Sequence, residues 1–152
     1  ICHPAGVIHH ALLRWLATQG VAPGMDVGDV GLIRDRRLHA RRAPGNTCLS
    51  ALSAARQFGD AARNNSKGCG TIMRVAPIAF VARGRVRDLA MATSALTHGH
   101  ATGQEAASAW ALILADLAQG LDLELAARKQ ENTFGPETAR ALEIAYSKLI
   151  RH

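Results

Sequence analysis

The chain is organised around one stretch, Asn64-Asn65-Ser66-Lys67-Gly68-Cys69-Gly70, which runs directly into Thr71-Ile72-Met73-Arg74-Val75-Ala76-Pro77. Two glycines separated by one residue let a backbone turn tightly and approach a ligand, because glycine has no Cβ. An apolar, helix-like segment follows at once, and a helix N-terminus offers free N–H groups that favour phosphate. The spacing matches neither the P-loop nor the dinucleotide-binding motif. The pattern predicts a site for a phosphate-bearing anion, with a plain connection as the alternative.

Residues 64–70, called the glycine segment below, supply the candidate binding residues, namely Asn64, Asn65, Ser66, Lys67, Gly68, Cys69 and Gly70. Their backbone N–H groups and the Ser66 hydroxyl would hold a diphosphate. Lys67 either adds a positive charge there or points into water. The two asparagines either contact the ligand or cap the turn, since Asn is a common turn residue. A nucleophilic role for Cys69 is the disfavoured interpretation.

The composition favours an all-α fold. The chain has 152 residues, of which 48% are hydrophobic and 4% aromatic, with abundant alanine. Alanine is the best helix former, whereas strands prefer aromatic and β-branched residues. A chain of this length forms one domain or part of one. We therefore expect helices packed as an irregular bundle.

Apolar periodicity places the expected helices over residues 4–18, 47–58, 70–81, 88–96, 102–119, 122–129 and from 136 onward. Pro77 should kink or break the third of these helices. Thr102 and Glu105 have the spacing of a capping box, which would start the fifth helix. Residues 21–46 read as a long loop with one short turn over 30–33.

The basic charge has two explanations. The formal net charge is +6, which either attracts phosphorylated ligands or reflects acidic motifs that lie outside the chain. The densest basic run lies in the long loop and consists of Arg34, Arg36, Arg37, Arg41 and Arg42. No aromatic residues are interleaved with these arginines, so nucleic acid is disfavoured as a partner.

Three cysteines, an odd number without metal-ligand spacing, suggest free thiols in a reducing cytoplasm. The longest apolar run, over residues 109–118, is interrupted by Asp116 and is too short to cross a bilayer. We expect a cytoplasmic protein without a membrane partner. His98 and His100 form a His-x-His pair, but no third ligand follows at useful spacing, so a transition-metal site is disfavoured.

Four ordered stretches resemble the ADP-ribosylglycohydrolase family, the relatives of the dinitrogenase reductase-activating glycohydrolase. Residues 66–77 resemble the family's central motif, in which Gly-Asn-Gly or Gly-Cys-Gly precedes Met-Arg-Val-Ala-Pro. The other three are an Arg-Trp helix at 14–20, a Pro-Gly-Asn-Thr segment within 42–52 and a Thr-His-x-His segment at 97–100. The resemblance weakens after about Gln119.

The resemblance implies an all-α ADP-ribosylglycohydrolase fold, with the glycine segment holding the diphosphate and ribose of ADP-ribose and His98 beside them. It implies a parent enzyme that removes ADP-ribose from a modified side chain or small molecule, using two Mg²⁺ ions. Cys69 stands where many members have Asn, and a thiol is a weaker donor. The expected ligands are ADP-ribose, an ADP-ribosylated protein or an ADP-ribosylated small molecule.

The family's metal motifs are missing from the printed sequence. Members open with Gly-Asp-Ala-x-Gly and Thr-Asp-Asp-Thr segments and close with Gly-Asp-x-Asp-Ser/Thr, whereas this chain contains no Asp-Asp pair. We therefore expect residues 1–152 to be the central part of one such domain, incomplete at both ends. We expect no catalytic residue and no metal ligand within it, and no hydrolysis by the piece alone. The alternative is a binding module that has lost its catalytic activity.

Overall fold

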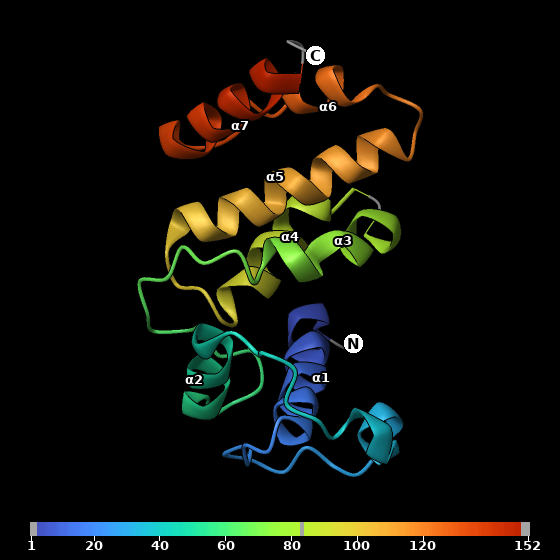
Figure 1. Cartoon of the computed structure of the whole chain (residues 1–152), viewed down its shortest axis with the longest axis vertical. Helices are drawn as coiled ribbons and strands as arrows, with labels where there is room; N and C mark the ends of the chain where they lie inside the picture. The colour runs from blue at the N-terminus through green and yellow to red at the C-terminus, as the bar shows by residue number, and fades with distance from the viewer. Residues whose placement is uncertain (1–2, 83, 150–152) are drawn as a thin grey trace.

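The structure is a computed structural model that describes residues 3–82 and 84–149, and over these residues it confirms the all-α prediction (Figure 1). Helices α1 to α7 are Pro4–Thr18, Asn46–Ala54, Ile72–Val81, Val86–Ala95, Ala101–Leu117, Leu123–Arg128 and Pro136–Leu149. Two short 3₁₀ helices, η1 (Gly31–Arg34) and η2 (Arg36–Leu38), lie between α1 and α2. No strand occurs in the described residues, and none of their helices is long and apolar enough to span a membrane.

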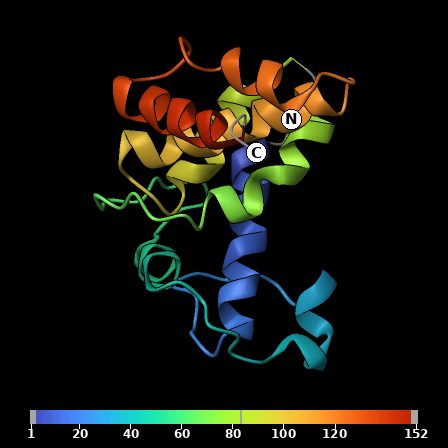
Figure 2. The same ribbon diagram turned by 45° about the horizontal axis from the view of Figure 1, so that its top comes forward.

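The helices stack in three layers along the long axis of the molecule (Figures 1 and 2). The lower layer holds α1, α2, η1 and η2 around an apolar cluster that includes Leu13, Leu16 and Leu52. The middle layer holds α3, α4 and α5, and the upper layer packs α6 and α7 on α5. Helix α1 also reaches α4, so it joins the lower layer to the middle one.

Alanines make the middle layer close-packed. Ala90, Ala107 and Ala111 are fully buried where α3, α4 and α5 meet, together with Val75 and Ile78. A methyl side chain lets neighbouring helices approach closely and leaves little space to fill. The alanine-rich composition therefore serves helix packing here. The glycine segment lies immediately before α3, at the edge of this layer (Figure 1).

Helix α2 is shorter than predicted. It ends at Ala54, because Ala55 has extended backbone with a ψ of 142°. The carboxylate of Asp60 then accepts hydrogen bonds from the backbone nitrogens of Arg56 and Gln57, both at 2.9 Å. This local alternative to helical hydrogen bonding explains why the predicted helix over 47–58 stops early.

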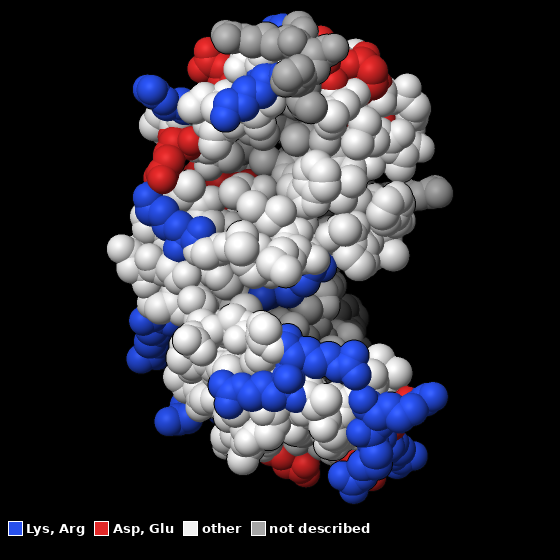
Figure 3. Space-filling model, in the orientation of Figure 1, with Lys and Arg blue, Asp and Glu red and all other residues white. Residues whose placement is uncertain are grey.

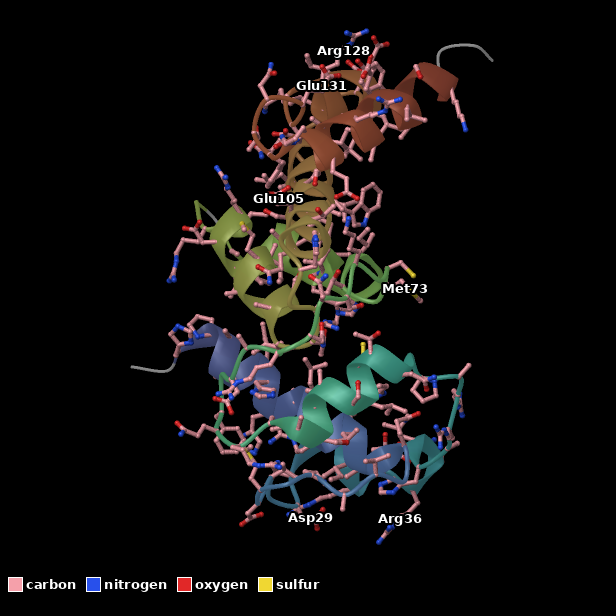
Figure 4. The ribbon with its side chains drawn as sticks, turned by 90° about the vertical axis from the view of Figure 1, so that its left-hand side faces the viewer. Asp29, Arg36, Met73, Glu105, Arg128 and Glu131 are labelled. Atoms are coloured by element: carbon pink, nitrogen blue, oxygen red, sulfur yellow. The ribbon has the colours of Figure 1, made fainter. Side chains whose placement is uncertain are left out.

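The predicted capping box at Thr102 and Glu105 is wrong. The residue before the helix is His100, whose Nδ1 accepts from the Thr102 nitrogen at 3.1 Å. The Glu105 carboxylate instead accepts from the Gly135 nitrogen at 3.2 Å and from the Thr138 hydroxyl at 2.9 Å. Glu105 thus attaches the start of α7 to α5 (Figure 4).

Pro77 was expected to kink or break the third helix, and it does not break it, because α3 continues through it. Proline removes one N–H, and the carbonyl that loses its partner is that of Met73. Met73 is 79% exposed and points away from the helices (Figure 4), so water can satisfy this carbonyl. The proline lies on the exposed side of α3, where the missing hydrogen bond costs least.

Three arginines of the basic run, Arg34, Arg36 and Arg37, belong to η1 and η2, which lie at the lower end of the molecule (Figure 1), and Figure 3 shows basic side chains gathered there. Arg37 forms an ion pair with Asp35 at 2.6 Å, and Arg34 approaches Asp29 at 3.6 Å. Figure 4 places Asp29 and Arg36 at the opposite end from Glu131 and Arg128. Acidic neighbours thus offset part of the positive charge in this loop.

Overpacking the middle layer should destabilise the chain. The substitution Ala107→Leu adds a side chain at a fully buried position between α5 and its neighbours. We expect it to lower the free energy of unfolding by about 1–3 kcal/mol, measured by urea denaturation. Ala101→Leu, at an exposed position of the same helix, is the control and should change it by less than about 0.5 kcal/mol. Equal effects of the two substitutions would contradict this packing.

Candidate functional site

The glycine segment folds against the imidazole ring of His98. A Cβ added to Gly68 would lie 3.1 Å from His98 Nε2, and one added to Gly70 would lie 3.3 Å from His98 Cε1. Both distances are tighter than ordinary van der Waals contact, so glycine is the residue that fits at each position. The structure therefore brings His98 together with the glycine segment, although 28 to 34 residues separate them in sequence.

Asn64 holds the glycine segment to the chain around His98. Its Oδ1 accepts from the backbone nitrogens of Ser66 at 3.1 Å and Gly99 at 3.0 Å, while its Nδ2 donates to the Thr97 carbonyl at 2.9 Å. A Cβ on Gly99 would overlap the carbonyl oxygen of Asn64. The side chain of Asn64 is therefore engaged with protein, and it fixes where the segment begins.

Ser66 links the glycine segment to α2. Its hydroxyl lies 3.3 Å from the Thr47 hydroxyl in the Pro-Gly-Asn-Thr segment and accepts from the Gly68 nitrogen at 3.2 Å. Gly103 on α5 approaches from the other side, where an added Cβ would lie 3.2 Å from the Ser66 carbonyl oxygen. Two glycines outside the segment, Gly99 and Gly103, thus allow its close packing against the helices.

Several backbone N–H groups of the glycine segment have no acceptor in the part of the chain that the structure describes. Among the described residues, no acceptor lies within hydrogen-bonding geometry of the amide nitrogens of Lys67, Cys69 and Gly70. Lys67, Gly68 and Cys69 are exposed, so a ligand can reach them. Free amides just before helix α3 form an arrangement that suits an anion.

His98 is buried, with 1% of its surface exposed, and it is neutral at pH 7. Burial lowers its pKa, and the positive charge of Arg74 lowers it further. Arg74 donates to the Thr97 hydroxyl at 2.7 Å, and that hydroxyl lies 2.8 Å from His98 Nδ1. We assign the Thr97 hydroxyl as the donor and His98 Nδ1 as the acceptor of this hydrogen bond. The hydrogen of the neutral ring then lies on Nε2, which faces the glycine segment.

Arg74 contacts neutral groups in the described part of the chain. Besides Thr97, it donates to the Thr93 carbonyl at 2.9 Å and lies 3.7 Å from the Cys48 sulfur. Burial lowers its pKa, yet a guanidinium stays charged. Arg74 thus orients His98 through Thr97.

Lys67 connects the glycine segment to α7. Its Nζ lies 2.8 Å from both carboxylate oxygens of Glu137, and the Thr102 hydroxyl donates to the same carboxylate at 2.9 Å. These two donors lower the pKa of Glu137, so it is ionised at neutral pH. The pair is exposed, so its net contribution to stability is small.

Some residues that build this site were not indicated by the sequence, and for others the sequence gave the motif but not the contacts. Thr47 and Thr97 lie inside quoted motifs, but no signal gave their hydrogen bonds to Ser66 and His98. No pattern pointed to Glu137, 70 residues beyond Lys67. Cys69 is exposed with its sulfur 4.0 Å from that of Met73, and Asn65 is exposed. His100 caps α5 and does not join the site.

The described residues do not provide a metal centre. Over residues 3–82 and 84–149, no three His, Cys, Asp or Glu side chains gather in a way that would hold a metal ion. The side chains of these residues therefore do not fit a two-magnesium site by themselves.

Comparison with known proteins identifies the class. The chain belongs to the ADP-ribosylglycohydrolase family, whose family model matches residues 2–151. The match extends past Gln119, where the sequence resemblance weakened, and includes α6 and α7. Comparison with curated proteins and with solved structures gives no match.

Low pH should destabilise the chain through its buried histidines. His98 and His9 both have pKa values lowered by burial, whereas the unfolded chain titrates near the ordinary value of about 6.5. Below that value the unfolded state binds more protons, so the free energy of unfolding falls as pH decreases from 7.5 to 5. The variant His98→Asn should reduce this slope in urea denaturation series. An unchanged slope would mean that His98 does not titrate differently on unfolding.

Proposed function

We propose that this chain forms the ADP-ribose-binding part of an ADP-ribosylglycohydrolase. The observation that carries the proposal is the set of N–H groups of the glycine segment that have no acceptor among the described residues, in a segment packed against the ring of His98. Such donors hold a diphosphate without needing to move when it binds. The family supports ADP-ribose as the diphosphate ligand.

Each residue near the glycine segment has a role in this proposal. The amides of Lys67, Cys69 and Gly70 would bind the diphosphate oxygens, and His98 Nε2 would donate to a phosphate or to the nearby ribose. Arg74 is a positioning residue that holds His98 in orientation through Thr97. Asn64 and Ser66 would set the shape of the turn through their hydrogen bonds to Gly99 and Thr47.

We propose that the intact parent hydrolyses the glycosidic bond between ADP-ribose and a modified side chain or small molecule. Two Mg²⁺ ions belong to this proposal through the family, with carboxylate ligands from outside the 152 residues. A metal centre of this kind would supply an activated water. The residues of this chain contribute binding and orientation, which lower the barrier by fixing the scissile bond.

Binding of ADP-ribose to the 152-residue chain should depend on the space around His98. In Gly70→Ala the new Cβ meets both Cys48 and His98 at 3.3 Å. The His98 ring or the glycine segment must then move, and we expect this movement to break a hydrogen bond to the charged phosphate. The loss of that hydrogen bond should weaken ADP-ribose binding about tenfold, measured by calorimetry. Gly45→Ala, where an added Cβ meets nothing within 4 Å, is the control. Equal affinities for both variants would contradict the proposed site.

The activity is tested by release of free ADP-ribose from ADP-ribosylated protein. We expect the intact parent to release it with Mg²⁺ and to stop when a chelator is added, while the 152-residue chain alone releases none. Turnover by the chain alone, free of contaminating enzyme, would contradict this division of roles. Binding without release by the intact parent would favour the alternative function, an ADP-ribose sensor on an inactive hydrolase fold.

A further inference from the structure

We propose that a pocket between α1 and the two 3₁₀ helices binds a small amphiphilic acid, a molecule with an apolar body and a single carboxylate. This α1–η1 pocket has a volume of about 370 Å³. Two arginines line it, Arg14 and Arg42. Its apolar wall includes Ala11, Trp15, Leu32, Ile33, Leu38 and Ala40.

The α1–η1 pocket is separate from the glycine segment. Its residues come from the second half of α1, from η1 and η2, and from the chain that follows η2. In Figures 1 and 2 the two 3₁₀ helices lie beside the lower end of α1, below the layer that the glycine segment joins. Among the described residues, none that lines the pocket forms a hydrogen bond with residues 64–70. A ligand in this pocket therefore leaves the proposed ADP-ribose site free.

Within the described part of the chain, the two arginines of the pocket have no carboxylate partner. Arg34 and Arg37, on the neighbouring 3₁₀ helices, each pair with an acidic side chain, but no ion pair includes Arg14 or Arg42. Arg14 is half-buried, and its side chain makes one long contact, 3.4 Å from Nη1 to the Val27 carbonyl oxygen. Guanidinium N–H groups match the charge and the geometry of carboxylate oxygens, so a carboxylate suits these donors.

The apolar wall of the pocket suits a hydrocarbon body. Leu32 is 77% exposed and Leu38 is 40% exposed, so both present apolar surface that a bound hydrocarbon would remove from water. Known small-molecule sites also combine mainly apolar walls with a few polar groups, at volumes of roughly 300–1,000 Å³. Because the surface is hollowed, a small molecule fits it better than a flat bilayer does.

The pocket is held in shape before any ligand binds. The Gln19 side chain is buried, with Nε2 donating to the Thr18 hydroxyl at 2.9 Å and Oε1 accepting from the Arg42 nitrogen at 3.4 Å. His39 Nε2 lies 2.6 Å from the Ile33 carbonyl oxygen. These contacts attach the chain after η2 to α1 and to η1, which reduces the ordering cost of binding a ligand between them.

Trp15 makes binding to the pocket observable by fluorescence. The chain has two tryptophans, so the variant Trp110→Phe leaves Trp15 as the single indole. Decanoate is the probe, because it joins a hydrocarbon chain to one carboxylate. We expect decanoate to change Trp15 emission until the pocket is saturated. Neutral 1-decanol should bind at least about tenfold more weakly, because it lacks the charge that the arginines bind.

The variant Arg42→Gln tests the charged end of the pocket. It keeps the backbone nitrogen that donates to Gln19. It should weaken decanoate binding about tenfold and leave 1-decanol binding unchanged. Arg36→Gln is the matched control, since Arg36 is an exposed arginine of η2 that does not line the pocket. It should leave the affinity for decanoate unchanged.

The variant Leu32→Ser tests the apolar end of the pocket. It should weaken decanoate and 1-decanol alike, by about fivefold, because less apolar surface is buried on binding. Since Leu32 is an exposed side chain, the substitution should leave the fold intact. Leu125→Ser, at a 50% exposed position of α6, is the control and should leave both affinities unchanged.

Four results would overturn the inference. The first is no saturable change of Trp15 emission with decanoate. The second is equal loss of affinity in Arg42→Gln and Arg36→Gln, which would indicate unspecific adsorption. The third is displacement of decanoate by ADP-ribose, which would place both ligands in one site. The fourth is an intact parent that does not bind decanoate, because the rest of the protein would then cover the pocket.

The inference and the proposed function can fail separately. Decanoate binding without ADP-ribose binding would refute the proposed function and support the α1–η1 pocket. ADP-ribose binding without decanoate binding would refute the pocket and support the proposed function.

Discussion

The site depends on the burial of His98 against the glycine segment. The His98 ring fits there because Gly68 and Gly70 have no side chain. The ring is neutral, and its Nδ1 is held by Thr97, whose hydroxyl is in turn held by Arg74. Gly68 and Gly70 pack so closely against this fixed ring that a Cβ added to either would lie 3.1 to 3.3 Å from it. A larger side chain at either glycine, or a different ring orientation, would close the same space.

Each of the three layers contributes contacts that hold that turn in place. The lower layer provides Thr47, which contacts Ser66, and the middle layer provides Thr97, Gly99 and Gly103. The upper layer contributes Glu137, which binds Lys67 from the start of α7. Elements far apart in sequence thus converge on one short segment, which explains why the segment needs the surrounding domain to keep its shape.

Sequence reasoning predicted the helical class, the first helix at Pro4–Thr18 and the glycine turn before α3, because alanine content, apolar periodicity and glycine are local signals. It failed where a distant partner decides a residue's contacts. Glu105 has capping-box spacing, yet it bonds to Gly135 and Thr138, which the local pattern does not contain. Pro77 is tolerated because the side of α3 on which it lies is exposed, and exposure also depends on the tertiary fold. The place of His98 came from family resemblance, since a lone histidine carries no positional signal.

The most direct measurement is a ¹⁵N nuclear magnetic resonance titration of the 152-residue chain with ADP-ribose, following each backbone amide. We expect the amides of Lys67, Cys69 and Gly70 to shift most, because none of them has an acceptor among the described residues. We expect a smaller response at Gly59, whose amide already donates to buried His9. Shifts concentrated in the basic loop over residues 34–42, with the glycine segment unchanged, would contradict the central claim.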